Sequence, residues 1–488
     1  MGRRKQFAKD VAYTAAAKYS GIFINMAISV VLARLLSPTD YGVIGLTTVF
    51  VAFFGLFGNM GFGSAIIQRH DLTREDYKDI FGITLWVGLI LGGLFFLSAP
   101  FIADFYNKDV LKPVCRLFAL NMVITSLNSV PDSLLSKSKK FNVLAVRQVS
   151  LQLLCGGLSI WAAFAGWGVY ALVLSTLSSS FLILCANTLY VRLPIHIFPS
   201  LNPLKKIFSF SIYLYLGGFV NYIGNNLSSL LVGKVMSLAD LGNYNKATGL
   251  VNMPMSNITG VITPVLYPYM AEINNDRDRM YQLFSRLNRF FVMAGFLLAT
   301  ILCMCSREII LILYGPKWAS IIICFSICTI VMGVQASSLA ITSALEACGD
   351  TRSLFQMGNV NTAVAFVGML IGVFAFRSIE GLAAMSSASA TFSCINCIYV
   401  GYRRAFNKSP KGILLYGLKF VVFFIVVSLS GLLITEFYTV NIVISLITKV
   451  AAWFILSVLF LKVFTDYDPR QIIGSVIDFI KSRRQVNA

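Results

Sequence analysis

Polar side chains inside otherwise apolar stretches are the residues of this sequence best able to do chemistry. Two of them are basic and four are amides: Lys18, Arg147, Asn25, Asn59, Asn221 and Asn225. Charged N–H donors attract anions, and a side-chain amide both donates and accepts hydrogen bonds. No nucleophile accompanied by a base is found among them. The set therefore predicts a place where a polar ligand binds, and not the active site of an enzyme.

The composition indicates that these residues belong to a membrane protein. Of the 488 residues, 57% are hydrophobic and 12% are charged, and the mean hydropathy is +0.76. A soluble domain, by contrast, carries about 25% charged residues. The net charge of +19 comes from basic residues in short groups between apolar runs, which is the arrangement of membrane topology signals. No basic stripe with interleaved aromatic residues is present, so the sequence predicts no nucleic-acid partner. The ten cysteines lie mainly in apolar runs, so neither a metal site nor a cofactor is predicted.

The apolar runs predict an all-α polytopic membrane protein. A bilayer core of about 30 Å takes about 20 apolar residues per helix, which gives about fourteen spans for this chain. The first twelve form two sets of six, near 13–36, 43–67, 80–103, 114–135, 143–165, 168–190, 207–232, 246–270, 289–314, 318–346, 353–376 and 380–402. A final pair lies near 412–437 and 440–464. Arg307 and Glu308 are expected to form a boundary feature near the outer end of the ninth span.

Basic residues concentrate in alternate connections between these spans, which predicts that both termini face the cytoplasm. None of the connections is long enough for a soluble domain. The predicted divisions are an N-terminal six-helix lobe at 1–200, a C-terminal six-helix lobe at 201–405, two additional transmembrane helices at 406–465 and a cytoplasmic tail at 466–488. Apolar residues at helical spacing give that tail one apolar face, so it is predicted to be an amphipathic helix on the inner leaflet.

A short polar turn occurs twice, and its two copies predict a duplicated architecture. The first copy runs from Arg34 to Gly42, and the second, 200 positions later, runs from Lys234 to Gly242. The identical positions in and before the turn are Asn25/Asn225, Ser29/Ser229, Ser37/Ser237, Asp40/Asp240 and Gly42/Gly242. In the first copy, the serine or the aspartate can cap the next helix, and the glycine allows close packing. A repeat of six spans keeps its orientation in the membrane, so an axis along the membrane normal would relate the two halves.

Each candidate side chain also has a purely structural interpretation. Lys18 can extend to the cytoplasmic interface, and Arg147 can anchor a helix end at the same interface. Asn25 and Asn225 can form hydrogen bonds between helices. Asn59 lies among glycines and can satisfy backbone groups that those glycines expose. The residues alone leave both interpretations open.

Five stretches carry motifs of a known protein family. The first begins at Ala33 and reads ARLLSPTDYGVIGLTTVFVAFFGLFGNMGFGSAIIQRHDLTREDY. The others are AFAGWGVYALV at 163–173, PVLYPYM at 264–270, LYGPKW at 313–318 and ALEACGDTR at 344–352. Together they resemble the polysaccharide transporter branch of the multidrug/oligosaccharidyl-lipid/polysaccharide exporter superfamily. Within that branch the chain is similar to Wzx-type flippases of the colanic-acid and teichuronic-acid exporter group.

The resemblance implies two six-helix lobes around a central cavity that opens alternately to each side. The implied cargo is an undecaprenyl-diphosphate-linked oligosaccharide repeat unit, flipped across the bacterial cytoplasmic (inner) membrane for capsule, exopolysaccharide or O-antigen synthesis. The first and seventh helices line the family's cavity, which makes Lys18, Asn25, Asn221 and Asn225 candidate cavity residues. Asn59 and Arg147 are added from neighbouring helices, and Lys18 would attract the diphosphate. The implied partners are membrane lipids, a polysaccharide polymerase, a chain-length regulator, and proton or sodium as the coupling ion.

Other functions are compatible with parts of the pattern. A drug/cation antiporter and a peptidoglycan-precursor flippase belong to the same superfamily. A membrane enzyme such as a polysaccharide polymerase or an O-acyltransferase fits less well, because the outer connections are short. In addition, His70 and His196 both fall in predicted cytoplasmic loops. The sequence therefore predicts a transporter and not an enzyme.

Overall fold

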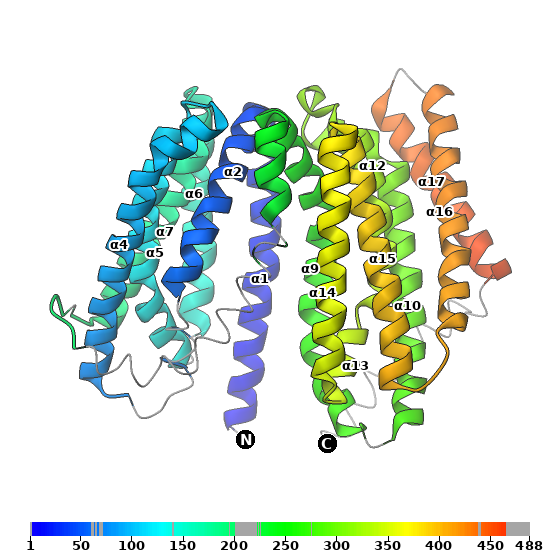
Figure 1. Ribbon diagram of the computed structural model, residues 1–488, viewed down its shortest axis with the longest axis horizontal. Coiled ribbons are helices and arrows are strands. Elements are labelled where there is room, and N and C mark those ends of the chain that lie inside the picture. The colour runs from blue at the N-terminus through cyan, green and yellow to red at the C-terminus, as the bar shows by residue number, and fades with distance from the viewer. Residues whose placement is uncertain are drawn as a thin grey trace. The chain divides into compact units, whose positions relative to one another are not determined.

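A computed structural model shows a chain built from long helices (Figure 1). It describes residues 2–59, 63, 66–67, 72–138, 141–194, 196–200, 222, 224, 226–274, 276–437 and 441–464. No strand occurs in these residues. The predicted all-α fold is therefore confirmed.

The helices follow the apolar runs closely. Those of the first half are α1 (Gly2–Leu35), α2 (Pro38–Asn59), α4 (Arg74–Tyr106), α5 (Leu111–Lys137), α6 (Phe141–Phe164) and α7 (Val169–Val191). Those of the second half are α9 (Leu238–Glu272), α10 (Arg277–Met304), α11 (Ser306–Leu313), α12 (Ile321–Ser338), α13 (Ile341–Ala347), α14 (Thr351–Ile371), α15 (Ile379–Ala405), α16 (Lys411–Phe437) and α17 (Ile442–Phe464). Two short pieces complete the set, a 3₁₀ turn η1 (Pro316–Trp318) and a π-helical turn η2 (Gly372–Phe376) that extends α14.

Twelve helical segments in the described part of the chain are long and apolar enough to cross a membrane. The predicted number of fourteen is therefore not confirmed, although a multi-pass membrane protein is. The predicted span at 246–270 lies within α9, a helix of 35 residues whose polar side chains keep it outside the twelve. The predicted span at 207–232 falls largely outside the described residues, as does the predicted amphipathic tail at 466–488.

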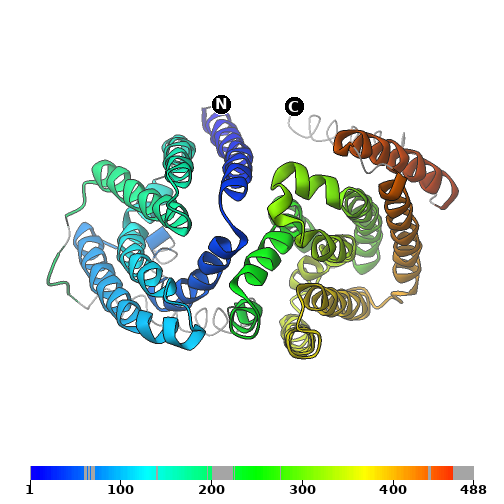
Figure 2. The same ribbon diagram turned by 90° about the horizontal axis from the view of Figure 1, so that it is seen from above.

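The described helices separate into two compact units. Residues up to Asn245, together with Leu313–Lys317, form unit 1, and the remainder form unit 2. In unit 1, α4 packs against α5, α5 against α7, α7 against α6, and α6 against α1 (Figure 2). In unit 2, α12 lies between α10 and α15, α14 packs against α15, and α16 packs against α10 and α17. The predicted division into lobes at 1–200 and 201–405 stays a prediction.

The duplicated turn forms the same capping structure twice. The Ser37 hydroxyl donates to Oδ2 of Asp40 at 2.7 Å, and the backbone N–H of Ser37 donates to the same oxygen at 2.9 Å. In the second copy, Ser237 donates to Asp240 at 2.7 Å through its hydroxyl and at 3.1 Å through its backbone. Each of these serine–aspartate pairs is a capping box, which satisfies N–H groups that the start of α2 or α9 would otherwise leave unpaired. The predicted capping role of the serine and the aspartate is confirmed.

The two copies of the turn also lie directly against each other within unit 1. A Cβ atom placed on Gly42 would collide with the backbone carbonyl of Leu238, and one placed on Gly242 would collide with the carbonyl of Pro38. The starts of α2 and α9 therefore cross at backbone distance, as the predicted close packing at Gly42 requires. The first residue of the LYGPKW motif contacts the first copy of the turn, because Nε of Arg34 donates to the carbonyl of Leu313 at 3.1 Å.

An ion pair fixes the C-terminal helix α17 to α11 within unit 2. Nζ of Lys449 on α17 donates to both carboxylate oxygens of Glu308 on α11, at 2.8 and 2.9 Å. The Ser445 hydroxyl donates to the same carboxylate at 2.7 Å, and Nε1 of Trp453 donates to Thr300 on α10 at 2.9 Å. The side chains of Lys449 and Glu308 are only 2% and 1% exposed. The partner of Glu308 is thus Lys449, 141 residues further along the chain, and the expected boundary position of Arg307 and Glu308 stays a prediction.

Candidate functional site

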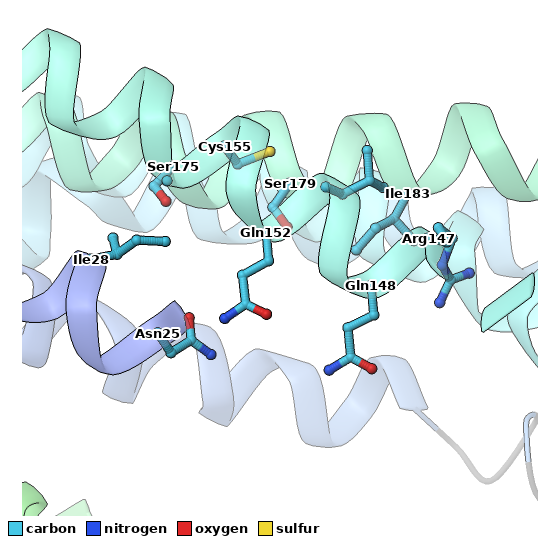
Figure 3. Close-up of a pocket in the computed structure, with 11 residues that line it drawn as sticks. Asn25, Ile28, Arg147, Gln148, Gln152, Cys155, Ser175, Ser179 and Ile183 are labelled. Carbon is cyan, nitrogen blue, oxygen red and sulfur yellow. The ribbon is translucent and has the colours of Figure 1, made fainter. Parts of the chain in front are cut away.

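A polar cavity of about 360 Å³ lies in unit 1, where α1, α6 and α7 meet (Figure 3). Its volume falls within the range of small-molecule sites, about 300–1,000 Å³. The lining side chains are mostly uncharged polar or apolar: Asn25, Ile28, Arg147, Gln148, Leu151, Gln152, Cys155, Gly156, Ser175, Ser179 and Ile183. The helices around the cavity are otherwise apolar, so the cavity concentrates polar side chains inside an apolar unit.

Helical spacing puts most of the polar lining groups on two stripes, one on α6 and one on α7. Gln148 and Gln152 are one turn apart on α6, and Ser175 and Ser179 are one turn apart on α7, so each pair lies on one helix face. Figure 3 shows the amide groups of the two glutamines extending from α6 into the same space as Asn25 of α1. The cavity wall is thus a set of amide and hydroxyl groups from three helices.

One hydrogen bond holds α1 against α6 beside the cavity. Nε2 of Gln152 donates to the backbone carbonyl of Gly21 at 2.8 Å, and Gly21 is buried. Since Gln152 lines the cavity and touches α1, it fixes the separation of two of the three walls. Its neighbour Gln148, one turn away, makes no hydrogen bond within the described part of the chain.

Arg147, at one end of the cavity, belongs to a charge-balanced network. Its Nη1 donates to Oδ1 of Asp132 on α5 at 3.0 Å and also to Oδ1 of Asn187 on α7. Nδ2 of Asn187 lies 3.4 Å from Asp132 and 3.4 Å from Oδ1 of Asn128. Asn187 is fully buried, so the network joins α5, α6 and α7 through their interior faces. The carboxylate cancels the guanidinium charge, which a half-buried arginine requires.

Of the six predicted site residues, two line the cavity, one does not, and three have side chains outside the described part of the structure. Asn25 and Arg147 both line the cavity. Lys18 lies on α1 with an exposed side chain and is not part of the lining. The Asn59 side chain, Asn221 and Asn225 lie outside the described residues.

Most of the polar lining was not predicted from the sequence. Gln148 and Gln152 follow Arg147 in an apolar run, and their four-residue spacing is a signal that could have identified a polar helix face. The spacing of Ser175 and Ser179 gives the same signal on α7. Asp132 was overlooked as well, although a carboxylate inside a predicted span needs a partner.

No group of histidine, cysteine, aspartate and glutamate side chains in the described residues could hold a metal ion. What the arrangement offers is hydrogen bonding to a polar ligand, with a paired arginine at one end. This is the chemistry of binding.

Comparison with known proteins assigns the chain to a family. Residues 31–323 match the family described as polysaccharide biosynthesis protein. The chain belongs to that family. The resemblance seen in the sequence motifs is thereby confirmed.

Two similar proteins and one solved structure extend this assignment. The teichuronic acid biosynthesis protein TuaB of Bacillus subtilis (strain 168) is 24% identical over 330 residues, which are 67% of this chain and 68% of TuaB. The lipopolysaccharide biosynthesis protein WzxC of Escherichia coli (strain K12) is 23% identical over 381 residues, 76% of each chain. The fold matches the lipid II flippase MurJ in an inward closed conformation with a TM-score of 0.70 and 13% identity, over 93% of this chain and 99% of MurJ. The family and the fold agree with the predicted transporter and not with a membrane enzyme.

Proposed function

We propose that this protein flips undecaprenyl-diphosphate-linked oligosaccharide repeat units across the bacterial cytoplasmic membrane by alternating access, for capsule, exopolysaccharide or O-antigen synthesis. The observation that carries the proposal is the family match over residues 31–323 in a chain whose whole fold is that of a flippase. The names of TuaB and WzxC, which refer to cell-surface polysaccharides, support the same cargo class.

The physical difficulty of this transport is the head group of the cargo. Sugars and a diphosphate lose their hydration in hydrocarbon at a cost of several kcal/mol for each uncompensated group. A protein can replace that hydration with fixed polar side chains while the lipid tail stays in the bilayer. The cavity between α1, α6 and α7 offers such groups in unit 1.

Individual residues are proposed to share this task. Asn25 and Arg147, in the cavity wall, would face the polar head group, and the exposed Lys18 on α1 would supply a positive charge for the diphosphate. Asn59, Asn221 and Asn225 complete the proposed set. An N-terminus in the cytoplasm, which the distribution of basic residues favours, would put Lys18 near the leaflet where the cargo is made.

Coupling and partners form the finer part of the proposal. A proton or a sodium ion would drive the cycle, and a polysaccharide polymerase and a chain-length regulator would receive the cargo outside. A proteoliposome assay in which a proton or sodium gradient is imposed tests the coupling. Equal translocation rates with and without both gradients would contradict it.

A second candidate is a peptidoglycan-precursor flippase, which the fold match to MurJ favours. The two functions share the lipid diphosphate and differ in the sugars, so genetics separates them. Deletion of the gene is expected to remove surface polysaccharide, to leave lipid-linked repeat units inside, and to spare growth. Loss of viability with unchanged surface polysaccharide would favour the peptidoglycan precursor. Unchanged polysaccharide in a viable deletion strain would refute the proposed function.

A further inference from the structure

The α1/α6/α7 cavity offers free hydrogen-bonding groups that carry no charge. Within the described residues, the side chains of Asn25, Gln148, Ser175 and Ser179 make no hydrogen bond to the protein. Two amides and two hydroxyls therefore remain available to a ligand. Each of these groups can both donate and accept a hydrogen bond.

Arg147 is the one formally charged side chain in the described lining, and its charge is already balanced. The Arg147 side chain is 16% exposed, and its Nη1 donates to Asp132 at 3.0 Å and to the Asn187 amide oxygen. Both bonds use Nη1, and the buried Nε has no hydrogen-bond partner among the described residues. An anion entering the cavity could therefore reach a donor, but it would have to share the guanidinium charge with a carboxylate of this chain. It would also bring an unbalanced charge into a cavity whose lining and paired carboxylate sum to zero.

We propose that this cavity receives an uncharged sugar unit of the cargo and not its diphosphate. The proposal rests on the proposed function and specifies which part of the head group unit 1 recognises. A sugar hydroxyl donates and accepts, as the four free side chains do, so every pairing in the cavity can be neutral. The apolar lining residues Ile28, Leu151 and Ile183 offer contact to the C–H groups of a sugar ring. The diphosphate is then bound elsewhere, outside the α1/α6/α7 lining.

A binding experiment with inorganic pyrophosphate tests the exclusion of the diphosphate. The full chain is placed in nanodiscs of phosphatidylcholine, and pyrophosphate binding is measured by calorimetry. The quantity compared is the Arg147-dependent affinity for pyrophosphate. It is the difference in affinity between a given protein, either the wild type or Asp132→Asn, and the same protein that also carries Arg147→Gln. We expect no such difference for the wild type and a clear one for Asp132→Asn, in which the guanidinium loses its counter-charge. Arg147-dependent binding to the wild type would overturn the proposal, and its absence in Asp132→Asn would overturn the charge cancellation on which the proposal depends.

A transport experiment tests the contact with sugar. Gln148→Leu and Ser179→Ala each remove one free neutral hydrogen-bonding group, so the initial translocation rate of the host's lipid-linked repeat unit in proteoliposomes should fall roughly three- to tenfold. Ser150→Ala is the matched control, because Ser150 is an exposed residue of α6 outside the cavity lining. Rates equal to the control in both variants would overturn the sugar assignment while the wild type still translocates. Failure of the proposed function would instead appear as no translocation by the wild type.

Discussion

Replacing Lys449 with methionine is expected to destabilise the protein by about 3–5 kcal/mol, because it leaves a buried carboxylate without its counter-charge. Methionine keeps most of the length and apolar volume of the lysine stem, so packing changes little. Glu308, whose side chain is 1% exposed, loses two bonds of 2.8 and 2.9 Å and retains the Ser445 hydroxyl at 2.7 Å. The retained donor places the expected loss nearer to about 3 kcal/mol than to 5. Since whole domains are stable by about 5–15 kcal/mol, such a loss is large.

The measurement is unfolding in a mixed-micelle SDS titration, followed by size-exclusion chromatography of the remaining folded fraction. Lys419→Met on the neighbouring helix α16 is the control, because the Lys419 side chain is exposed and the same substitution should cost less than about 1 kcal/mol there. The double variant Lys449→Met/Glu308→Gln removes both charges and should recover most of the loss, since a buried pair is often replaceable by neutral groups at little cost. A Lys449→Met variant as stable as Lys419→Met would refute the reasoning, and so would a double variant no more stable than the single one.

Three further expectations concern the turns and the loop before residue 200. Gly42→Ala should force apart two crossing backbones and lower the stability by about 1–3 kcal/mol or more. Gly55→Ala on the same helix is the control, because its added Cβ meets nothing within 4 Å, and it should be neutral or stabilising. Equal stabilities of the two variants in the SDS titration would contradict the close crossing. Ser237→Ala should cost about 1 kcal/mol through the lost cap, measured in the same titration, and no change would show that the cap is dispensable. His196→Ala removes a 2.9 Å hydrogen bond to Asp79, so the backbone amides of 196–200 should exchange hydrogen up to about tenfold faster; unchanged exchange would show that other contacts hold the segment.

Much of the fold could be predicted because local patterns determine it. The apolar run at 168–190 predicted α7 to within one residue at each end, and the serine and aspartate at 37 and 40 predicted a cap that the structure contains. Apolar length and capping chemistry act over a few neighbouring residues, so a single sequence displays them. The predicted span at 246–270 lies within the α9 helix, but its polar side chains lower its mean hydropathy, so it is not among the twelve segments apolar enough to span a membrane.

The cavity could be predicted only in part, because its residues come together through packing. Asn25 and Arg147 were identified as polar groups in apolar runs, which is a local property. The pairing of Arg147 with Asp132, and of Glu308 with Lys449, depends on which helix lies beside which, and no periodicity contains that information. Pairs of opposite charge inside predicted spans are nevertheless worth matching to one another in sequence, since each buried charge needs a partner.

The reciprocal contact of the two polar turns has the form of an isologous interface. Gly42 meets the residue at 238, and Gly242 meets the residue at 38, so the same two positions contact each other twice with their roles exchanged. This is the pattern by which identical subunits pair around a two-fold axis. The contact therefore has, within one polypeptide, the reciprocal form of a homodimer interface. A substitution at Gly42 therefore disturbs the contact with Leu238, while the equivalent contact of Gly242 with Pro38 keeps its native residues and serves as an internal reference in the same molecule.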